Sequence, residues 1–406
     1  MDLYSIYLHV PFCRHRCSYC DFNTFAGQDR LIPAYVDAIC KEICKVSAGA
    51  GERIPVHTVF FGGGTPSLLA VSYLERILDT LRERFDLLPG AEITLEANPG
   101  TVSPEYLQGL RRLGVNRLSF GMQSAHPDDL RLLERQHDFF DVAQAVKWSR
   151  EAGFDNLSLD LIFALPGQPL ARWQETLERA VAMQPDHLSL YSLIIEQGTP
   201  LQRRWARGLI PTVDDDLAAD MYEWAMDYLP KVGFEQYEIS NWARRAPGGI
   251  LRACRHNLQY WYNRPYLGLG AGAHGYAAGT RTMNTGGIRP YIDRCEEAGA
   301  QQHAPHAALA FPRSPATRRA IPLSREDEMQ ETMMVGLRLT QEGVSCEAFQ
   351  QRFGQALEDT FGPQIDRLVK LGLLEWTGAE DRRLRLTRRG IMVGNQVFME
   401  FVGESA

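Results

Sequence analysis

Three cysteines near the N-terminus are the residues of this chain best suited to chemistry. Cys13, Cys17 and Cys20 form a C-x3-C-x2-C run directly after the apolar stretch Ser5–Val10. Structural zinc sites and fully ligated four-iron clusters usually take four protein ligands. No fourth cysteine follows nearby, because the next thiol is Cys40. The spacing therefore predicts a [4Fe-4S] cluster with one iron left open, and an incomplete zinc site or unrelated thiols are the alternatives.

A run of glycines, Gly62-Gly63-Gly64, stands between the apolar segment His57–Phe61 and Thr65-Pro66. Glycine has no Cβ, so the backbone N–H and C=O groups of such a turn can approach a ligand closely. We interpret this turn as part of a binding site at the end of a strand. A plain strand-to-helix turn is the alternative.

Polar side chains close several later strand-like runs. Glu96, Gln123 and Asp160 stand at or near such ends, and Arg135 follows the run that ends near Gln123. A carboxylate, an amide and a guanidinium complement a ligand that carries an ammonium, a carboxylate and a diol. A carboxylate inside an apolar strand is costly without a partner, so we expect Asp160 to face a ligand or a cation. A structural salt bridge or a helix cap is the alternative for each residue.

A second candidate site lies in the hexapeptide His256-Asn-Leu-Gln-Tyr-Trp261. A neutral imidazole is a good axial ligand for haem iron, and Tyr260 and Trp261 offer flat surface to a macrocycle. From residue types alone, a histidine beside aromatic residues is more often a core or hydrogen-bonded residue. Cys254 is a rival ligand. Pro247-Gly248-Gly249 lies just upstream and predicts a mobile segment.

Strand-like and helical runs alternate through the first half of the chain. Such alternation predicts a parallel sheet with right-handed crossovers, whose site lies at the C-terminal ends of the strands. Six units are too few for an eight-stranded barrel, so the fold class is α/β, a partial (β/α)6 barrel. The expected strands are Ser5–Val10, His57–Phe61, Glu92–Glu96, Arg117–Gly121, Asn156–Ile162 and His187–Leu193.

The rest of the chain predicts a second domain. We expect a barrel domain with the haem motif over residues 1–300, a linker or flap over 301–323, and a C-terminal domain over 324–406. The C-terminal domain reads as three helices, a two-stranded hairpin and a closing helix, which is typical of a winged-helix-like module. These elements are expected at Arg325–Leu339, Cys346–Phe353, Gln355–Leu371, Leu373–Trp376, Arg382–Leu386 and Arg389–Phe401.

Composition excludes several classes of protein. The formal net charge is −7, so no basic surface predicts a nucleic-acid partner. Eight cysteines in 406 residues do not form a disulfide scaffold and favour a reducing compartment. The first residues lack the pattern of a signal peptide, and no apolar run is long enough to span a bilayer. We expect a cytoplasmic protein without a transmembrane segment, and peripheral contact with a membrane stays open.

The cysteine run resembles the cluster loop of the radical S-adenosylmethionine (SAM) superfamily. In that family the amino and carboxylate groups of SAM bind the open iron, and one electron from the cluster breaks a C–S bond of SAM. Tyr19 matches an aromatic residue that lies against the adenine. The whole pattern is similar to the branch that contains oxygen-independent coproporphyrinogen III oxidase, in the porphyrin biosynthesis pathway. The resemblance implies SAM contacts by Tyr7, Gly63, Gly64, Thr65, Glu96, Gln123, Arg135 and Asp160.

Two features distinguish this chain from the oxidase. Only twelve residues precede Cys13, and Phe22 stands where the oxidase has a further cysteine. The hexapeptide His256–Trp261 resembles the haem-binding signature of the HemW family of haem chaperones. The resemblance implies haem as cargo, with respiratory enzymes as acceptors and a storage protein such as bacterioferritin as donor. It implies no catalytic residue. Coproporphyrinogen III dehydrogenase activity and a radical reaction on haem itself are the alternatives, so enzyme activity stays open.

Overall fold

The computed structural model describes residues 3–300, 309–379 and 381–402. The chain divides into two compact units, one formed by Met1–Tyr228 with Pro265–Ile321 and one by Leu229–Arg264 with Pro322–Ala406. The segment with the haem motif is therefore grouped with the C-terminal residues. The domain bounds expected from the sequence stay a prediction. Part of the expected linker, residues 301–308, lies outside the described residues, and its last part, Thr317–Pro322, forms strand β14.

A mostly parallel sheet forms the centre of the first unit, with β12 and β13 added antiparallel at one edge. Within this unit its strands follow the order β14-β13-β12-β11-β1-β4-β5-β6-β7-β8. All neighbouring strands in the run β11-β1-β4-β5-β6-β7-β8 are parallel to each other. The six strands expected from the sequence are present, and β11 is a parallel strand that the sequence analysis missed. The bounds are β1 Tyr4–Val10, β4 Pro55–Gly63, β5 Asp86–Ala97, β6 Arg117–Gln123, β7 Leu157–Phe163, β8 His187–Ser192, β11 Tyr266–Leu269, β12 His274–Ala277 and β13 Thr280–Asn284.

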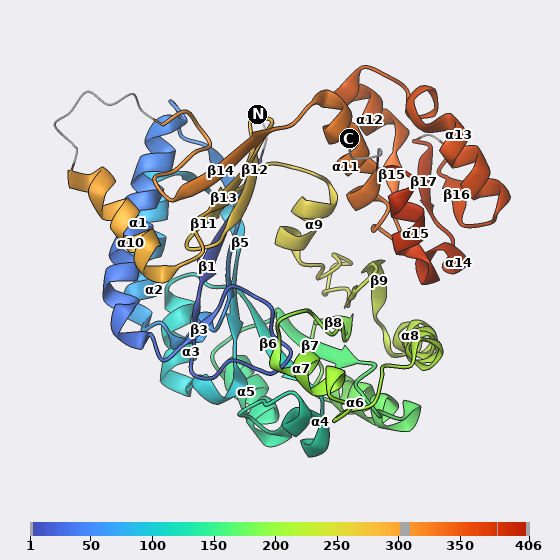
Figure 1. Ribbon diagram of the computed structural model, residues 1–406, viewed down its shortest axis with the longest axis horizontal. Coiled ribbons are helices and arrows are strands. Elements are labelled where there is room, and N and C mark those ends of the chain that lie inside the picture. Colours follow the sequence, from blue (N-terminus) through green and yellow to red (C-terminus); the bar gives the residue numbers. More distant parts are fainter. Residues whose placement is uncertain (1–2, 301–308, 380, 403–406) are drawn as a thin grey trace. The chain divides into compact units, whose positions relative to one another are not determined.

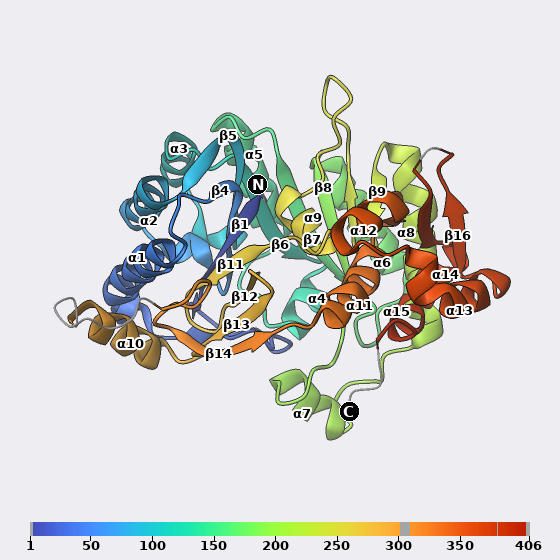
Figure 2. The ribbon, with the colours of Figure 1, turned by 90° about the horizontal axis from the view of Figure 1, so that it is seen from above.

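Helices cover the outer face of this sheet (Figure 1). Helix α1 shows why: its buried residues recur at helical spacing, so one apolar stripe faces the strands. Helix α10 lies beside α1 in both views (Figure 2). The helices of this unit are α1 Ile32–Gly49, α2 Val71–Arg84, α3 Pro104–Arg112, α4 Pro127–Leu132, α5 Phe139–Glu151, α6 Leu170–Ala182, α7 Pro200–Ala206, α8 Asp215–Tyr228 and α10 Ile288–Ala300. None of the helices in the described part of the chain combines the length and apolar character needed to cross a membrane.

The second unit holds the winged-helix-like module. Its three-stranded sheet has the order β15-β17-β16, and the core between sheet and helices is apolar, with Met333, Leu337, Leu357, Leu384 and Val397 fully buried. The expected closing helix is two short helices. The bounds are β9 Glu235–Glu238, β10 Asn241–Ala243, α9 Arg255–Trp261, α11 Arg325–Gly336, β15 Val344–Ser345, α12 Cys346–Phe353, α13 Leu357–Lys370, β16 Leu374–Thr377, β17 Arg383–Leu386, α14 Arg388–Met392 and α15 Gly394–Met399.

The strand register brings polar residues of the first sheet into adjacent rows. His9 of β1 is paired with Gly62 of β4, and Glu96 of β5 is paired with Ser119 of β6. Asp160 of β7 is paired with Gly121, also on β6. Successive strands therefore carry polar groups at neighbouring positions, which is the arrangement that the sequence analysis expected at the strand ends.

Candidate functional site

The three cysteines of the N-terminal run lie in a loop that starts at β2 (Phe12–Cys13) and returns at β3 (Phe25–Ala26). Each sulfur has a polar side-chain group nearby, and the three contacts come from three parts of the first unit. They join Thr65 Oγ1 to Cys13 Sγ at 3.6 Å, Arg135 Nη1 to Cys17 Sγ at 3.6 Å, and Thr24 Oγ1 to Cys20 Sγ at 3.8 Å. Donors beside thiolate sulfur stabilise its negative charge and raise the reduction potential of a cluster bound to it.

The donor set of this loop fits an open four-iron cluster. Burial raises the pKa of the Cys13 thiol, the Thr65 hydrogen bond opposes that rise, and the nearby Cys20 and Cys17 add to it. The three thiols are thus close enough to interact. Among the residues that the structure describes, no three His, Cys, Asp or Glu side chains converge as ligands of a single ion. A [4Fe-4S] cubane does not need such convergence, because each cysteine binds a different iron and the sulfurs stand farther apart than the ligands of one ion.

The glycine turn packs directly on the cysteine loop. The Gly64 N–H donates to the carbonyl of Val10 at 2.8 Å, and the Thr65 N–H donates to the carbonyl of Phe12 at 2.8 Å. A Cβ on Gly64 would stand 2.6 Å from the Phe12 carbonyl oxygen and 3.0 Å from Cys13 Sγ. Glycine is required here because the backbone fills the space that a side chain would need.

Tyr7 lies beside this turn and is tied to a histidine that the sequence analysis missed. The Tyr7 hydroxyl is 3.1 Å from His9 Nδ1, and His9 Nε2 is 2.9 Å from the carbonyl oxygen of Asn23 in the cluster loop. Burial lowers the pKa of His9, which favours the neutral imidazole. The alternation of side chains along a strand could have identified His9, because residues two apart, such as Tyr7 and His9, lie on the same face.

Glu96 and Asp160 form an acidic pair inside the sheet. The Gly63 N–H donates to Glu96 Oε2 at 3.1 Å. Burial and, after it, the Asp160 charge raise the pKa of Glu96 to about 7. Burial also raises the pKa of Asp160, while the Ser119 hydroxyl, which lies 3.1 and 3.0 Å from its two oxygens, opposes that rise. Asp160 therefore already has partners inside the protein.

Gln123 and Arg135 lie at the C-terminal end of β6. Gln123 is buried and has a φ of 65°, a left-handed conformation that is strained for a side chain with Cβ. Arg135 donates from Nη2 to the carbonyl of Gly121 at 2.8 Å. Its Nε is buried and has no hydrogen-bond partner among the described residues, which leaves one donor for a ligand.

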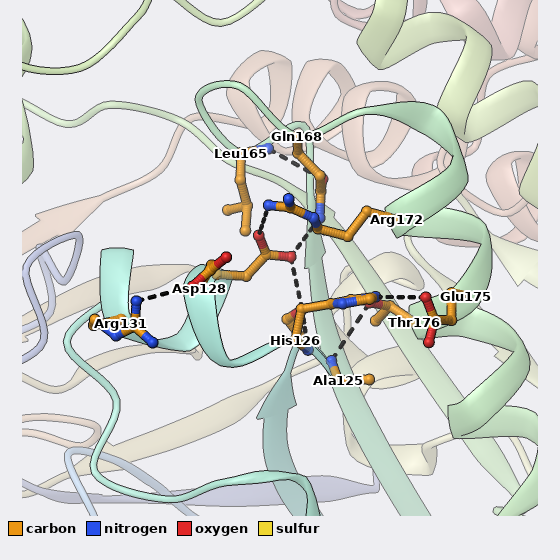
Figure 3. Close-up of polar contacts among 11 residues, drawn as sticks. Ala125, His126, Asp128, Arg131, Leu165, Gln168, Arg172, Glu175 and Thr176 are labelled. Carbon is orange, nitrogen blue, oxygen red and sulfur yellow. Dashed lines mark hydrogen bonds and ion pairs between the residues drawn. The ribbon is translucent and has the colours of Figure 1, made fainter.

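A buried carboxylate, Asp129 of α4, holds the turn that follows Gln123. Its partners Gln168 and Arg172 are labelled in Figure 3. Its Oδ2 accepts from Ser124 Oγ at 2.8 Å and from Gln168 Nε2 at 3.1 Å, and its Oδ1 accepts from Arg172 Nη1 at 3.1 Å. The network joins the end of β6 to the segment between β7 and α6. It holds the backbone that follows the strained Gln123, and the sequence analysis did not single it out.

The C-terminal end of α4 also contacts the cluster loop. Ser18 donates from its backbone N–H to the carbonyl of Leu133 at 3.3 Å and from its hydroxyl to the carbonyl of Leu132 at 3.0 Å. The Ser18 carbonyl in turn accepts from the backbone N–H of Leu201 at 2.9 Å. The cysteine loop and the strand end that carries Gln123 are therefore held as one assembly within the first unit.

The histidine of the hexapeptide lies in α9 of the second unit. His256 is 2% exposed, and its Nε2 is 2.9 Å from the Tyr260 hydroxyl. The two rings meet edge on, with centroids 5.2 Å apart. Cys254 is buried at the N-terminal end of the same helix. His256, Tyr260 and Trp261 thus come from one short helix, and the imidazole nitrogen already engages a phenol.

Trp261 packs under a cation. The Arg338 guanidinium carbon lies 4.3 Å from the centroid of the Trp261 ring, and Arg338 Nη2 is 3.5 Å from Glu238 Oε2. Glu238 is fully buried, and burial raises its pKa while Arg338 opposes that rise. The residues upstream of α9 are described throughout, and Gly248 and Gly249 both have positive φ in a turn. The expected mobility of this segment stays a prediction.

Comparisons with known proteins agree with this architecture. Residues 7–180 match the model of the radical SAM superfamily, and residues 323–393 match the model of the HemN C-terminal domain. The solved coproporphyrinogen III oxidase HemN from Escherichia coli superposes with a TM-score of 0.80 at 24% identity, covering 98% of this chain and 90% of that one. That likeness establishes the fold, including the partial barrel and the C-terminal module.

Proteins that are similar over nearly their whole length identify the family. The heme chaperone HemW from Bacillus subtilis is 37% identical over 404 residues, which is 98% of this chain and 99% of that protein. The heme chaperone HemW from Lactococcus lactis is 36% identical over 398 residues, 98% of this chain and 97% of that protein. The similarity therefore spans both units of this chain and nearly the whole length of each relative. This chain therefore belongs to the HemW family of radical SAM proteins.

Proposed function

We propose that this chain is a haem chaperone that carries a [4Fe-4S] cluster and SAM, binds haem and transfers it to haem-dependent proteins. The observation that carries the proposal is the similarity to heme chaperone HemW from Bacillus subtilis over 98% of this chain. The sulfur contacts of the N-terminal loop and the hexapeptide on α9 support it independently.

The cluster and SAM would supply one-electron chemistry in the first unit. In this proposal Cys13, Cys17 and Cys20 bind three irons, and Thr65, Arg135 and Thr24 stabilise their sulfurs. Residues around the loop would bind SAM: Tyr7, Gly63, Gly64, Thr65, Glu96, Gln123, Arg135 and Asp160. The buried Nε of Arg135, which lacks a partner among the described residues, supports a role in binding the SAM carboxylate.

Haem would bind at α9 of the second unit. His256 and Tyr260 offer two groups that can ligate iron, and Trp261, held against Arg338, offers a flat apolar face. The acceptors in this proposal are haem proteins such as respiratory enzymes, and the donor is a haem store such as bacterioferritin. We place this exchange in the cytoplasm, with peripheral contact at membrane-bound acceptors.

A transfer assay tests the proposal. Anaerobically reconstituted protein is loaded with haem and mixed with an apo respiratory subunit, and the Soret band of the acceptor is followed after separation. We expect transfer to the acceptor. Protein that binds no haem, or that keeps all of it in the presence of excess acceptor, would contradict the chaperone function.

The alternative function, coproporphyrinogen III dehydrogenase, can be assayed directly. The same protein is supplied with coproporphyrinogen III, SAM and a low-potential reductant, and the porphyrin products are separated. We expect no protoporphyrinogen IX, because Phe22 stands where the oxidase has a cysteine, and it is 63% exposed at the end of the cluster loop. Formation of protoporphyrinogen IX would favour the dehydrogenase.

A further inference from the structure

We infer that the Tyr260 oxygen is the axial ligand that this chain offers to haem iron, and that His256 accepts the phenolic proton. The inference rests on the proposed haem-binding function and changes the role expected for His256. It concerns two side chains of α9.

The geometry of α9 carries the inference. His256 and Tyr260 are four residues apart on one helix, which places their side chains on the same face. The imidazole is buried and its Nε2 lies 2.9 Å from the Tyr260 hydroxyl, whereas Tyr260 is only partly buried. For Nε2 to reach iron, the imidazole would have to leave both its buried position and this hydrogen bond. The Tyr260 oxygen can keep its contact with His256 when it binds iron, and Tyr260 is less buried than the imidazole.

The chemistry of the pair suits ferric haem. A neutral phenol is a poor ligand, and phenolate is a good one for iron(III), as in the tyrosine-ligated haem of catalase. When the Fe–O bond forms, the O–H bond of Tyr260 breaks and its proton moves to His256 Nε2. Charge is conserved within the pair and no oxidant or reductant is needed.

Spectroscopy of the full chain tests this assignment. Ferric haem is titrated into anaerobically reconstituted wild type, Tyr260→Phe, His256→Gln and Cys254→Ala, and the Soret band, the visible charge-transfer region and the EPR spectrum are recorded. Tyr262→Phe is the matched control, because its hydroxyl lies at the end of the same helix and donates to Glu342 at 2.9 Å. Circular dichroism and cluster iron content verify that each variant is folded.

We expect a high-spin ferric spectrum with a phenolate charge-transfer band in wild type, lost in Tyr260→Phe. That variant should bind ferric haem at least about tenfold more weakly, which corresponds to ~1.4 kcal/mol. His256→Gln should keep the band with weaker binding, and Tyr262→Phe should match wild type. An unchanged spectrum in Tyr260→Phe, with loss in His256→Gln or in Cys254→Ala alone, would overturn the inference and leave the chaperone function intact. Wild type that binds no haem would overturn both.

Discussion

The carboxyl group of Glu96 allows a quantitative test of the electrostatics at the proposed SAM site. Burial and the Asp160 charge raise its pKa from 4.5 to about 7, against the opposing Gly63 hydrogen bond. One pKa unit corresponds to about 1.4 kcal/mol, so ionised Glu96 should destabilise the folded protein by up to ~3 kcal/mol. The substitution Glu96→Gln removes the charge and keeps a similar side-chain shape.

The sign of the effect follows from proton linkage. Below the unfolded pKa of 4.5, Glu96 is protonated in both states and contributes no difference. Between pH 4.5 and 7 the unfolded chain releases the proton while the folded protein retains it, so the free energy of unfolding falls as the pH rises. Above pH 7 the loss is complete. Glutamine does not titrate, so the variant lacks this part of the pH dependence.

Urea unfolding at two pH values measures the difference. Wild type and Glu96→Gln are prepared anaerobically in the same cluster state without SAM, and the free energy of unfolding is determined at pH 5 and pH 8. Relative to wild type, the variant should gain up to ~3 kcal/mol between the two pH values. Glu83→Gln, an exposed site on α2, is the control. A difference that is the same at both pH values, or a variant that becomes relatively less stable at pH 8, would refute the reasoning.

Three further substitutions test the assembly around the cysteines. Gly64→Ala should lose most cluster iron after reconstitution, because its Cβ would stand 2.6 Å from a backbone carbonyl oxygen, whereas Gly362→Ala, with open space, should keep it. Asp129→Ala should lower the free energy of unfolding by about 2–4 kcal/mol, since it leaves buried donors unpaired, and should weaken the SAM-induced change in the EPR spectrum. Asp128→Ala, an exposed ion-pair residue, should do neither. Arg135→Lys should lower the cluster reduction potential in an EPR-monitored titration, because lysine cannot make both contacts of the guanidinium; an unchanged potential would contradict the role of its sulfur contact.

The sequence predicts the strands of the barrel because their apolar runs are short and bounded by turns. It also predicts the cysteine loop and the glycine turn, since local spacing carries that information. Strand β11 was missed for a physical reason. It is four residues long and is held by its pairing with β1, residues that are far away in the sequence. Only tertiary contact distinguishes such a segment from a loop.

Long-range polar partners explain what else the sequence could not give. Asp129 reads as one of several acids in a surface helix, and its burial depends on Gln168 and Arg172 from a different βα unit. Asp160 was expected to face a ligand or a cation, and the structure gives it serine donors and the Arg117 charge. The residue type correctly predicted that a partner is needed, and the fold decides which partner is present.

The two candidate sites differ in how completely their polar groups are satisfied, and that difference bears on their roles. At α9 the potential ligands His256 and Tyr260 are paired with each other. Near the cysteines, Arg135 keeps a buried donor that no described residue satisfies. A site with an unmet donor favours a resident ligand, because binding removes the cost of the buried group. A site whose groups satisfy one another gains less from binding, which suits the cargo of the proposed chaperone. The polar contacts within each unit therefore agree with the proposal that SAM is retained and haem is passed on.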